Sequence, residues 1–474
     1  MKFTVNKILF LALLISFSCS DYLEPDPVSF ISGDSFYSND DELETGIFTI
    51  YDGLQGINDD QFDDLRSVQG EYMLTEMRSD NTKSRSGGNA ESDFQQFEIY
   101  QIDVLNFVVR NYYESMYNVL HRIHLVLDNL DAASDERRAA FEGEAKFVRA
   151  YTYFQLVRLF GAVPMPLTQI RPEDEETSFT RIDENIIYAQ MVEDLEIAIE
   201  NLDDSFKTRA SRSAARALLA KVYLTIAGDP ELNPDIEQTD GYLAARELCE
   251  AIINEGSFSL VPDYLEVFTN ERNAEIIWAI DFIPDNLETS QNFSLEWTDD
   301  GDRRLNYTTQ NIRSVYAARG ETVRALFAPS EIVGEFFVTK YLPDGGILEQ
   351  AGNDWVVLRY ADVLLMYVEA VLGGNQATGE PQALTFYNEV RARAGFTTPV
   401  TSISRNELLE ERRMEFAFEN QRFFDLVRFG VAGEVLSAHS EATGGDFVDT
   451  DLLLPIPQNE ISLSRGLLEQ NLGY

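Results

Sequence analysis

The chain has 474 residues, of which 44% are hydrophobic and 12% aromatic. This composition predicts a folded protein with one large core or up to about three domains, because disordered chains are poor in aromatic residues. Asp and Glu number 81 against 37 Lys and Arg, which gives a net charge of −44. A surface this acidic repels phosphate backbones, so nucleic acid is excluded as an expected partner.

The N-terminus has the features of an export signal, with a positively charged end and a short apolar run at 8–15. That run is too short for a bilayer, which takes about 20 residues. The residues before Cys19 resemble a lipobox, although Ser16 stands where Leu is usual. We expect a signal peptide at 1–18, lipid on Cys19 and a tether at 19–35. The alternative is ordinary cleavage before the cysteine, which would give a soluble secreted protein.

The only other cysteine, Cys249, shares a helical face with Ala245 and Ile252 through spacings of four and three. Two cysteines in such different settings do not form a disulfide framework. We therefore expect Cys249 to be a buried, unreactive thiol.

Helical spacing of apolar residues dominates the N-terminal half after the tether, beginning at Leu43, Ile47 and Ile50. Further helices are predicted, several with alanines at their crossing points, at 145–160, 190–202, 214–227 and 243–254. Such pairs indicate tetratricopeptide-like units, although an ordinary helical bundle has the same alanine packing.

The second half is less regular. A strand is predicted at 275–280, a polar loop region follows, and helices return at 356–371, 382–394 and 405–419. In the last of these, Arg412, Glu415 and Glu419 are spaced for ion pairing, and we expect them to hold the fold. The same interpretation applies to Arg422, Asp425 and Arg428, since guanidinium groups suit partly buried carboxylates.

Catalytic chemistry has little support in the sequence. His121 and His124 are spaced to face one metal ion, but the chain has no HExxH motif and no evident third ligand, so a packing role is favoured. Nucleophile-elbow, phosphate-loop and dinucleotide-binding motifs are absent from the sequence. We predict a binding protein without enzymatic activity, bound metal or cofactor.

Ligand contacts are predicted in two polar loops, at 78–93 and 286–307, because sugar sites combine an aromatic platform with amides, carboxylates and Arg. The candidate residues are Arg78, Asp80 and Asn81 in the first loop, and Phe293, Trp297, Asp299, Arg304, Asn306 and Tyr307 in the second. Trp297 is the preferred platform, with core packing as its alternative. Trp278 and Trp355 are interpreted as structural.

Several sequence blocks, in this order, resemble a known family. They are GEAKFVRAY at 143–151, LVRLFG at 156–161, LRYADVLL at 358–365, NEVRARAG at 388–395, ERRMEF at 411–416, RFFDLVR at 422–428, LPIP at 454–457 and QNLGY at 470–474. The family is that of the SusD/RagB nutrient-binding lipoproteins, and the resemblance runs from Cys19 to Tyr474. Asn420 stands where the family often has Gly, and Phe423 where it often has Trp.

This resemblance implies a mostly α SusD-like fold, with tetratricopeptide-like helix pairs at 36–260 packed against an irregular second half at 261–474 that has short β-strands. It also implies a lipid-anchored protein of the cell outer membrane, exposed to the exterior, that captures a nutrient for a SusC-like TonB-dependent transporter. The implied ligand is an oligosaccharide or polysaccharide. Peptide capture of the RagB type, or a structural lid without affinity of its own, are the alternatives.

Overall fold

The computed structural model describes residues 36–56, 67–84, 92–171, 174–286, 288–294, 306–327, 330–332, 335–342 and 350–474. Its long helices are α3 (Asp40–Gln55), α6 (Phe107–Leu127), α7 (Arg138–Phe160), α9 (Glu184–Asn201), α10 (Arg212–Gly228), α11 (Gln238–Glu255), α14 (Gln310–Arg319), α15 (Tyr360–Leu372), α16 (Pro381–Arg393), α17 (Arg405–Glu415) and α19 (Ala432–Thr443). Short helices are α4 (Val68–Leu74), α5 (Ser92–Ile99), α8 (Glu175–Phe179), α12 (Glu266–Thr269), α18 (Arg422–Arg428) and α20 (Gln458–Leu463).

The strands are short and antiparallel. They are β1 (Thr82–Lys83), β2 (Ile276–Ile280), β3 (Tyr307–Thr308), β4 (Ser330–Ile332), β5 (Glu335–Phe337), β6 (Trp355–Arg359), β7 (Ala377–Thr378) and β8 (Ile403–Ser404). Among the described residues they form one sheet in the order β1-β3-β5-β4 and two pairs, β2-β6 and β7-β8.

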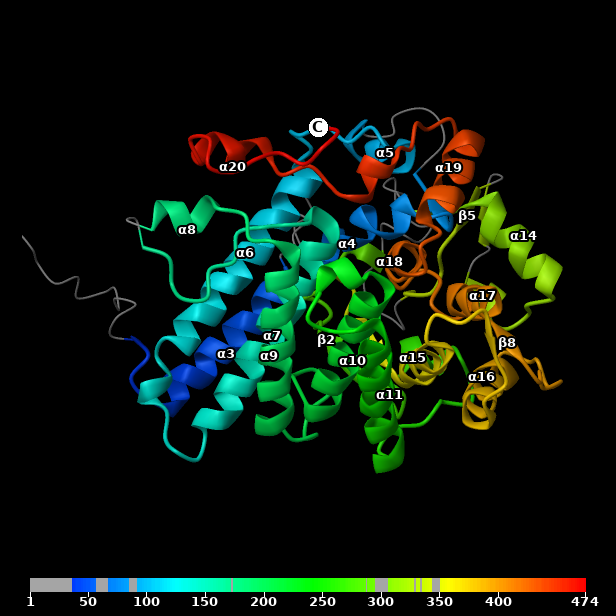
Figure 1. Cartoon of the computed structure of the whole chain (residues 1–474), viewed down its shortest axis with the longest axis horizontal. Helices are drawn as coiled ribbons and strands as arrows, with labels where there is room; N and C mark the ends of the chain where they lie inside the picture. The colour runs from blue at the N-terminus through cyan, green and yellow to red at the C-terminus, as the bar shows by residue number, and fades with distance from the viewer. Residues whose placement is uncertain are drawn as a thin grey trace, which may run out of the picture.

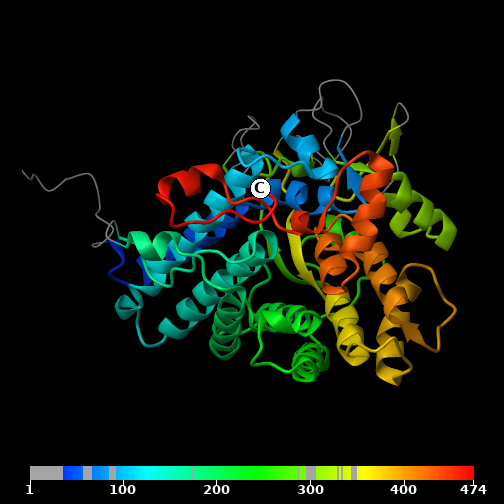
Figure 2. The ribbon, with the colours of Figure 1, turned by 45° about the horizontal axis from the view of Figure 1, so that its top comes forward.

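Eight helices form a continuous row, in which each packs on the next in the order α3, α6, α7, α9, α10, α11, α15 and α16. Figures 1 and 2 show this row as an arc that runs from blue and cyan through green to yellow, with the more irregular segments on its inner side. The mostly α fold with tetratricopeptide-like helix pairs is thus confirmed. The last two helices come from the 261–474 half, so both halves contribute to one layer.

Local sequence explains both the ends and the closeness of these helices. Ser211 accepts a hydrogen bond from the Ala214 amide at 3.1 Å and so caps α10. Gly256 ends α11 in the left-handed conformation that glycine adopts without strain. A Cβ added at Gly241 would lie only 3.2 Å from the Cβ of Ala227, so small residues let α10 and α11 approach closely.

The predicted helix at 356–371 is wrong in its first turn. Residues 355–359 instead form β6, which pairs with β2, and the helix starts at Tyr360. A short apolar run fits either a buried strand or a buried helix, and the β-branched Val356 and Val357 favour the strand.

The predicted helix at 405–419 is also too long, because α17 ends at Glu415. Phe418 and Asn420 have φ angles of 68° and 57°, which a helix cannot contain. Asn420 stands where the family often has Gly. After glycine, asparagine is among the residues that best tolerate this left-handed conformation, so the replacement suits the turn.

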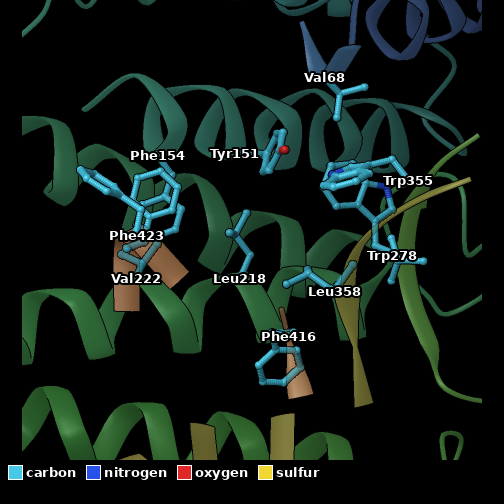
Figure 3. Packing of buried hydrophobic residues seen from close by; sticks show 14 of the residues in the cluster. Val68, Tyr151, Phe154, Leu218, Val222, Trp278, Trp355, Leu358, Phe416 and Phe423 are labelled. Carbon is cyan, nitrogen blue, oxygen red and sulfur yellow. The ribbon is translucent and has the colours of Figure 1, made fainter. Parts of the chain in front are cut away.

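The hydrophobic core joins the helical row to the second half through two tryptophans. The Trp278 ring on β2 packs edge-on against Phe147 and Tyr151 of α7, with ring centroids 4.8 and 4.9 Å apart. Trp355 on β6 lies close to Trp278 in Figure 3 and contacts Tyr341 at 5.0 Å. Both tryptophans are buried, as is Cys249, and the structural interpretation of all three is confirmed.

A buried ionic network surrounds the end of α17. Glu415 accepts hydrogen bonds from Arg359 at 2.7 Å and Arg324 at 3.2 Å, and also pairs with Arg393. Burial alone would raise the pKa of Glu415, but these three cations outweigh it and hold the pKa well below its ordinary value. The prediction that this segment holds the fold through ion pairs is confirmed.

We predict that Glu415→Ala lowers the free energy of unfolding by roughly 3 to 5 kcal/mol, because it leaves three buried guanidinium groups without their shared carboxylate. Denaturant titration measures this. Asp131→Ala, which breaks an ion pair with Arg138 on the surface, is the matched control and should leave stability nearly unchanged. Equal effects of the two substitutions would contradict a structural role for the network.

A second buried carboxyl, that of Asp354, lies just beyond the β2–β6 ladder. The last register pair of the ladder is Ile280–Trp355, and beyond it Asp281 follows Ile280 while Asp354 precedes Trp355. Asp354 accepts a hydrogen bond from the Phe282 amide at 3.1 Å. Burial, followed by the charges of Glu271 and Asp281, raises the pKa of Asp354 to about 8. The folded protein therefore retains a proton there that the unfolded chain releases near the ordinary value of 3.8.

Between pH 3.8 and about 8 the unfolded chain binds fewer protons at Asp354 than the folded chain, so this group makes stability fall as pH rises. We predict that Asp354→Asn removes the loss, because a neutral amide can donate to the carboxylate of Asp281. The gain at pH 8 should be about 1.5 to 3 kcal/mol, measured by denaturant titration, and should shrink toward pH 4. Exposed Asp135→Asn is the control. Parallel pH profiles of the Asp354 variant and the original chain would refute the assignment.

Candidate functional site

The pairing of β1 with β3 brings the two predicted ligand loops together. Lys83 lies opposite Tyr307 and Thr82 opposite Thr308. The Thr309 amide adds a 2.8 Å hydrogen bond to the carbonyl of Asn81. Because the strands are antiparallel, the chain leaves β1 and enters β3 at the same end of the ladder. Two loops chosen separately from the sequence therefore start from one place, which we call the ladder end.

At the base of the first loop, the Arg78 side chain points into the protein and is fully buried. It donates to the backbone carbonyls of Leu74 and Leu452, both at 3.1 Å, and to that of Asp451. Its guanidinium carbon lies 4.2 Å from the centre of the Phe423 ring. Arg78 therefore joins the loop to the C-terminal segment and does not reach a ligand surface.

Asp80 and Asn81 are buried as well. The Asp80 carboxylate accepts from Arg422 at 2.8 Å and lies 2.9 Å from a nitrogen of Arg413. Burial would raise the pKa of Asp80, but the two cations prevail and hold it far below its ordinary value. The Asn81 amide donates to Glu76 at 3.0 Å and accepts from Arg413 at 2.8 Å. These side chains fix the loop base from within.

The described residues at the base of the second loop are buried as well. Phe293 is 1% exposed and packs edge-on against Trp355, and Tyr307 is 2% exposed within β3. Trp297, Asp299 and Arg304 lie outside the described residues. The second loop thus has a buried base whose aromatic rings belong to the core.

Asn306 differs from the other predicted residues. It is 1% exposed, and neither its amide nitrogen nor its amide oxygen has a hydrogen-bond partner within the described part of the chain. An unsatisfied buried amide costs about 1 to 3 kcal/mol per group, so Asn306 needs partners from outside the described residues. It lies at the ladder end and directly follows the segment 295–305, which is outside the described residues.

Glu98, at the end of α5, is a residue that the sequence did not single out. Its carboxylate accepts from the backbone amide of Ser84 at 3.0 Å and from the Ser84 hydroxyl at 2.5 Å. The pairing fixes the point where the chain leaves the ladder. A single glutamate in a helix gives no signal for such a contact, because the partner lies 14 residues earlier in a loop.

A groove of about 510 Å³ opens between segments 263–269, 323–327 and 339–342. Its volume lies in the usual range of ligand sites, about 300 to 1,000 Å³. Leu265, Leu326 and Leu342 line it with exposed fractions of 49%, 72% and 45%. The amine of Lys340 is engaged by Glu419 at 2.6 Å. This leucine groove has exposed aliphatic side chains beside the rings of Tyr264 and Phe327, in contrast to the polar ladder end.

Of the two histidines that the sequence analysis assigned to packing, His124 is buried in the helical layer, whereas His121 is exposed. His124 is 2% exposed, and burial, followed by the charge of Arg149, lowers its pKa to about 3, so the ring is neutral. Within the described ranges, no group of three or more His, Cys, Asp or Glu side chains is arranged to hold a metal ion.

Two family models match the chain. One described as "SusD family" matches residues 256–474, and one described as "Starch-binding associating with outer membrane" matches residues 50–224. A SusD-like protein of Formosa agariphila is 26% identical in an alignment that covers 99% of this chain and 99% of the relative. Solved structures of other proteins share the fold with this chain, among them the following two.

The first of these structures is a laminarin-binding SusD-like protein, with a TM-score of 0.75 at 23% identity over 92% of this chain and 100% of that one. The second is surface glycan-binding protein A from Bacteroides thetaiotaomicron in complex with laminarihexaose, with a TM-score of 0.73 at 20% identity over 91% and 99%. Family models thus match both halves of the chain, and the relative aligns along its whole length. The chain belongs to the SusD family.

Proposed function

We propose that this protein captures an oligosaccharide or polysaccharide at the outer membrane and passes it to a SusC-like TonB-dependent transporter, without cleaving it. The observation that carries the proposal is the meeting of two polar loops at the ladder end, in a chain whose fold is that of a laminarin-binding protein. A rigid frame that carries loops is the usual basis of a binding site.

In this proposal the second loop provides the recognition surface. Trp297 is the platform for the apolar face of a sugar ring, and Asp299 and Arg304 bond its hydroxyl groups. Asn306, at the root of the loop, offers its unpartnered amide to the ligand. Phe293 and Tyr307, with Arg78, Asp80 and Asn81, support the two loops from below through the buried contacts described above.

Peptide capture remains the second candidate, and the leucine groove is the observation that favours it. Aliphatic side chains such as Leu265 and Leu326 match apolar peptide side chains better than they match sugar hydroxyls, which need polar partners. Loss of peptide binding on Leu326→Ser, with glycan binding retained, would separate this site from the ladder end.

Attachment to the membrane is proposed through lipid on Cys19. Within the described residues, no helix is long and apolar enough to cross a membrane. The family model that matches residues 50–224 is described as associating with the outer membrane. An acyl chain supplies membrane affinity through burial of its methylene groups, at about 0.8 kcal/mol each.

We predict that Trp297→Ala weakens glycan binding by about 1 to 3 kcal/mol, the scale for loss of an aromatic anchor, while hardly changing stability. Calorimetric titration with laminarihexaose, the ligand seen with a structural relative, gives the affinity, and thermal melting gives the stability. Trp278→Phe, a change in the core, is the matched control. It should lower the melting temperature of the protein and leave the affinity of the folded fraction unchanged.

Two outcomes would count against this assignment. Unchanged affinity together with a large fall in melting temperature would place Trp297 in the core and direct the search to the 78–93 loop. Release of shorter saccharides during the titration, from protein free of contaminating hydrolases, would make the protein an enzyme.

We predict that Cys19→Ala releases the protein from membranes or leaves its N-terminal segment uncleaved, because the thiol is the proposed point of lipid attachment. Detergent phase partitioning of the original and variant proteins, expressed without a partner transporter, measures this. Ser20→Ala, next to the cysteine, is the control and should partition as the original protein does. A Cys19→Ala protein that still partitions into detergent would refute the lipid anchor.

A further inference from the structure

A small cavity of about 30 Å³ lies where α7 and α10 of the helical row meet β6, α4 and the turn between α17 and α18. Five of its aromatic and aliphatic lining residues are labelled in Figure 3: Tyr151, Phe154, Leu218, Trp355 and Leu358. A water molecule needs about 10 to 15 Å³ of space for its centre, so this cavity has room for about two. None of its lining residues belongs to the ladder end or to the leucine groove.

Asn420, in the turn between α17 and α18, lines this cavity and is 4% exposed. Its side-chain oxygen has no hydrogen-bond partner within the described part of the chain. The side-chain nitrogen donates to the Glu71 carboxylate at 3.4 Å, so turning the amide over would only bring two oxygens together. A buried acceptor without a donor is uncommon in a folded protein, and this one calls for a donor within the cavity.

Glu71 of α4 lines the same cavity and is also 4% exposed. It forms no ion pair with any residue that the structure describes. The hydrogen bonds that its carboxylate accepts from Tyr112 and Asn420 are both long, at 3.4 Å. Burial raises the pKa of Glu71, and the hydrogen bond of Gln155 and the charge of Arg158 offset this only in part. A further donor would therefore stabilise the carboxylate.

Arg158 brings a positive charge to the cavity without touching Glu71. Its guanidinium donates to the Phe154 carbonyl at 3.0 Å and to the side chain of Gln155, and its carbon lies 3.7 Å from the centre of the Phe424 ring. No carboxylate pairs with it among the residues described. Burial lowers the pKa of Arg158 to about 10, although the nearby charges of Tyr188 and Glu71 raise it. A cation and a carboxylate thus line one cavity without direct contact.

The charges around the cavity favour a neutral ligand. A cation would lie next to Arg158 and Lys221, and an anion would lie next to Glu71 and Glu419, all of which line the cavity. The ligand must donate to the Asn420 oxygen and to the Glu71 carboxylate, and it must accept from a guanidinium. Water is small enough, carries no net charge, and both donates and accepts hydrogen bonds.

We propose that this cavity binds about two ordered water molecules, which bridge the Asn420 oxygen, the Glu71 carboxylate and the Arg158 guanidinium. The waters join α4, the helical row and the turn after α17 through hydrogen bonds that the protein does not make by itself. Since α4 leads directly into the base of the first loop, they also fix that base. The proposal does not depend on glycan capture at the ladder end.

A crystal structure of the full chain tests this proposal directly. We expect ordered water oxygens in the cavity, one of them within hydrogen-bond distance of both the Asn420 oxygen and the Glu71 carboxylate. In solution, magnetic relaxation dispersion of water oxygen counts waters with long residence times. Asn420→Gly should gain about one such water, because it frees space beside a buried carboxylate. Glycine tolerates the φ of 57° at this position, so the variant should fold.

The control is Val222→Ala on α10, where Val222 is 0% exposed. It opens space lined by carbon atoms and should gain no long-lived water, because apolar cavities stay dry. A dry cavity in the crystal, or a protein donor bonded to the Asn420 oxygen there, would overturn the proposal. So would an equal gain of water in Asn420→Gly and Val222→Ala, or no gain in the glycine variant. If that variant is unfolded, the crystal structure of the original chain decides.

Discussion

The guanidinium of Arg359 ties together separate segments of the 261–474 half at the point where β6 becomes α15. It donates to Glu275 at 2.8 Å, to Glu415 at 2.7 Å and to Glu419 at 2.8 Å. Only 2% of the Arg359 side chain is exposed, so water cannot replace a lost partner. Removing any one of these charges would therefore leave another one buried without a partner. Strands β2 and β6 and helices α15 and α17 consequently have one compatible arrangement, and the loops rest on it.

Buried hydrogen bonds from another arginine of α17 extend this network toward the ladder end. Two residues before Glu415, Arg413 bonds the side chain of Asn81 at 2.8 Å and the carbonyl of Asp80 at 3.1 Å. A single helix thus anchors the core network on one side and the root of the first loop on the other. The base of the first loop is therefore fixed by the same helix that anchors the core, and rigid supports of this kind are usual beneath binding loops.

Sequence patterns predicted the helical row because helical periodicity and alanine seams are local properties. The sequence patterns gave wrong predictions where a residue or strand contacts a partner far away in the chain. The apolar run at 355–359 could be assigned to a strand only once β2 was available to pair with it. Arg78 and Asp80 have the composition of a solvated loop, yet their partners lie more than 330 residues away. The loops' convergence depends on two-residue strands, which leave no pattern to read.

Charge also limits which sugars can approach. The chain carries a net charge of −44, in which buried cations such as Arg359 are already counted, so the field outside the protein is negative. A sulfated or uronate-rich glycan must approach against that field, which salt screens only beyond about 8 Å at physiological ionic strength. Neutral and amine-bearing sugars meet no such barrier.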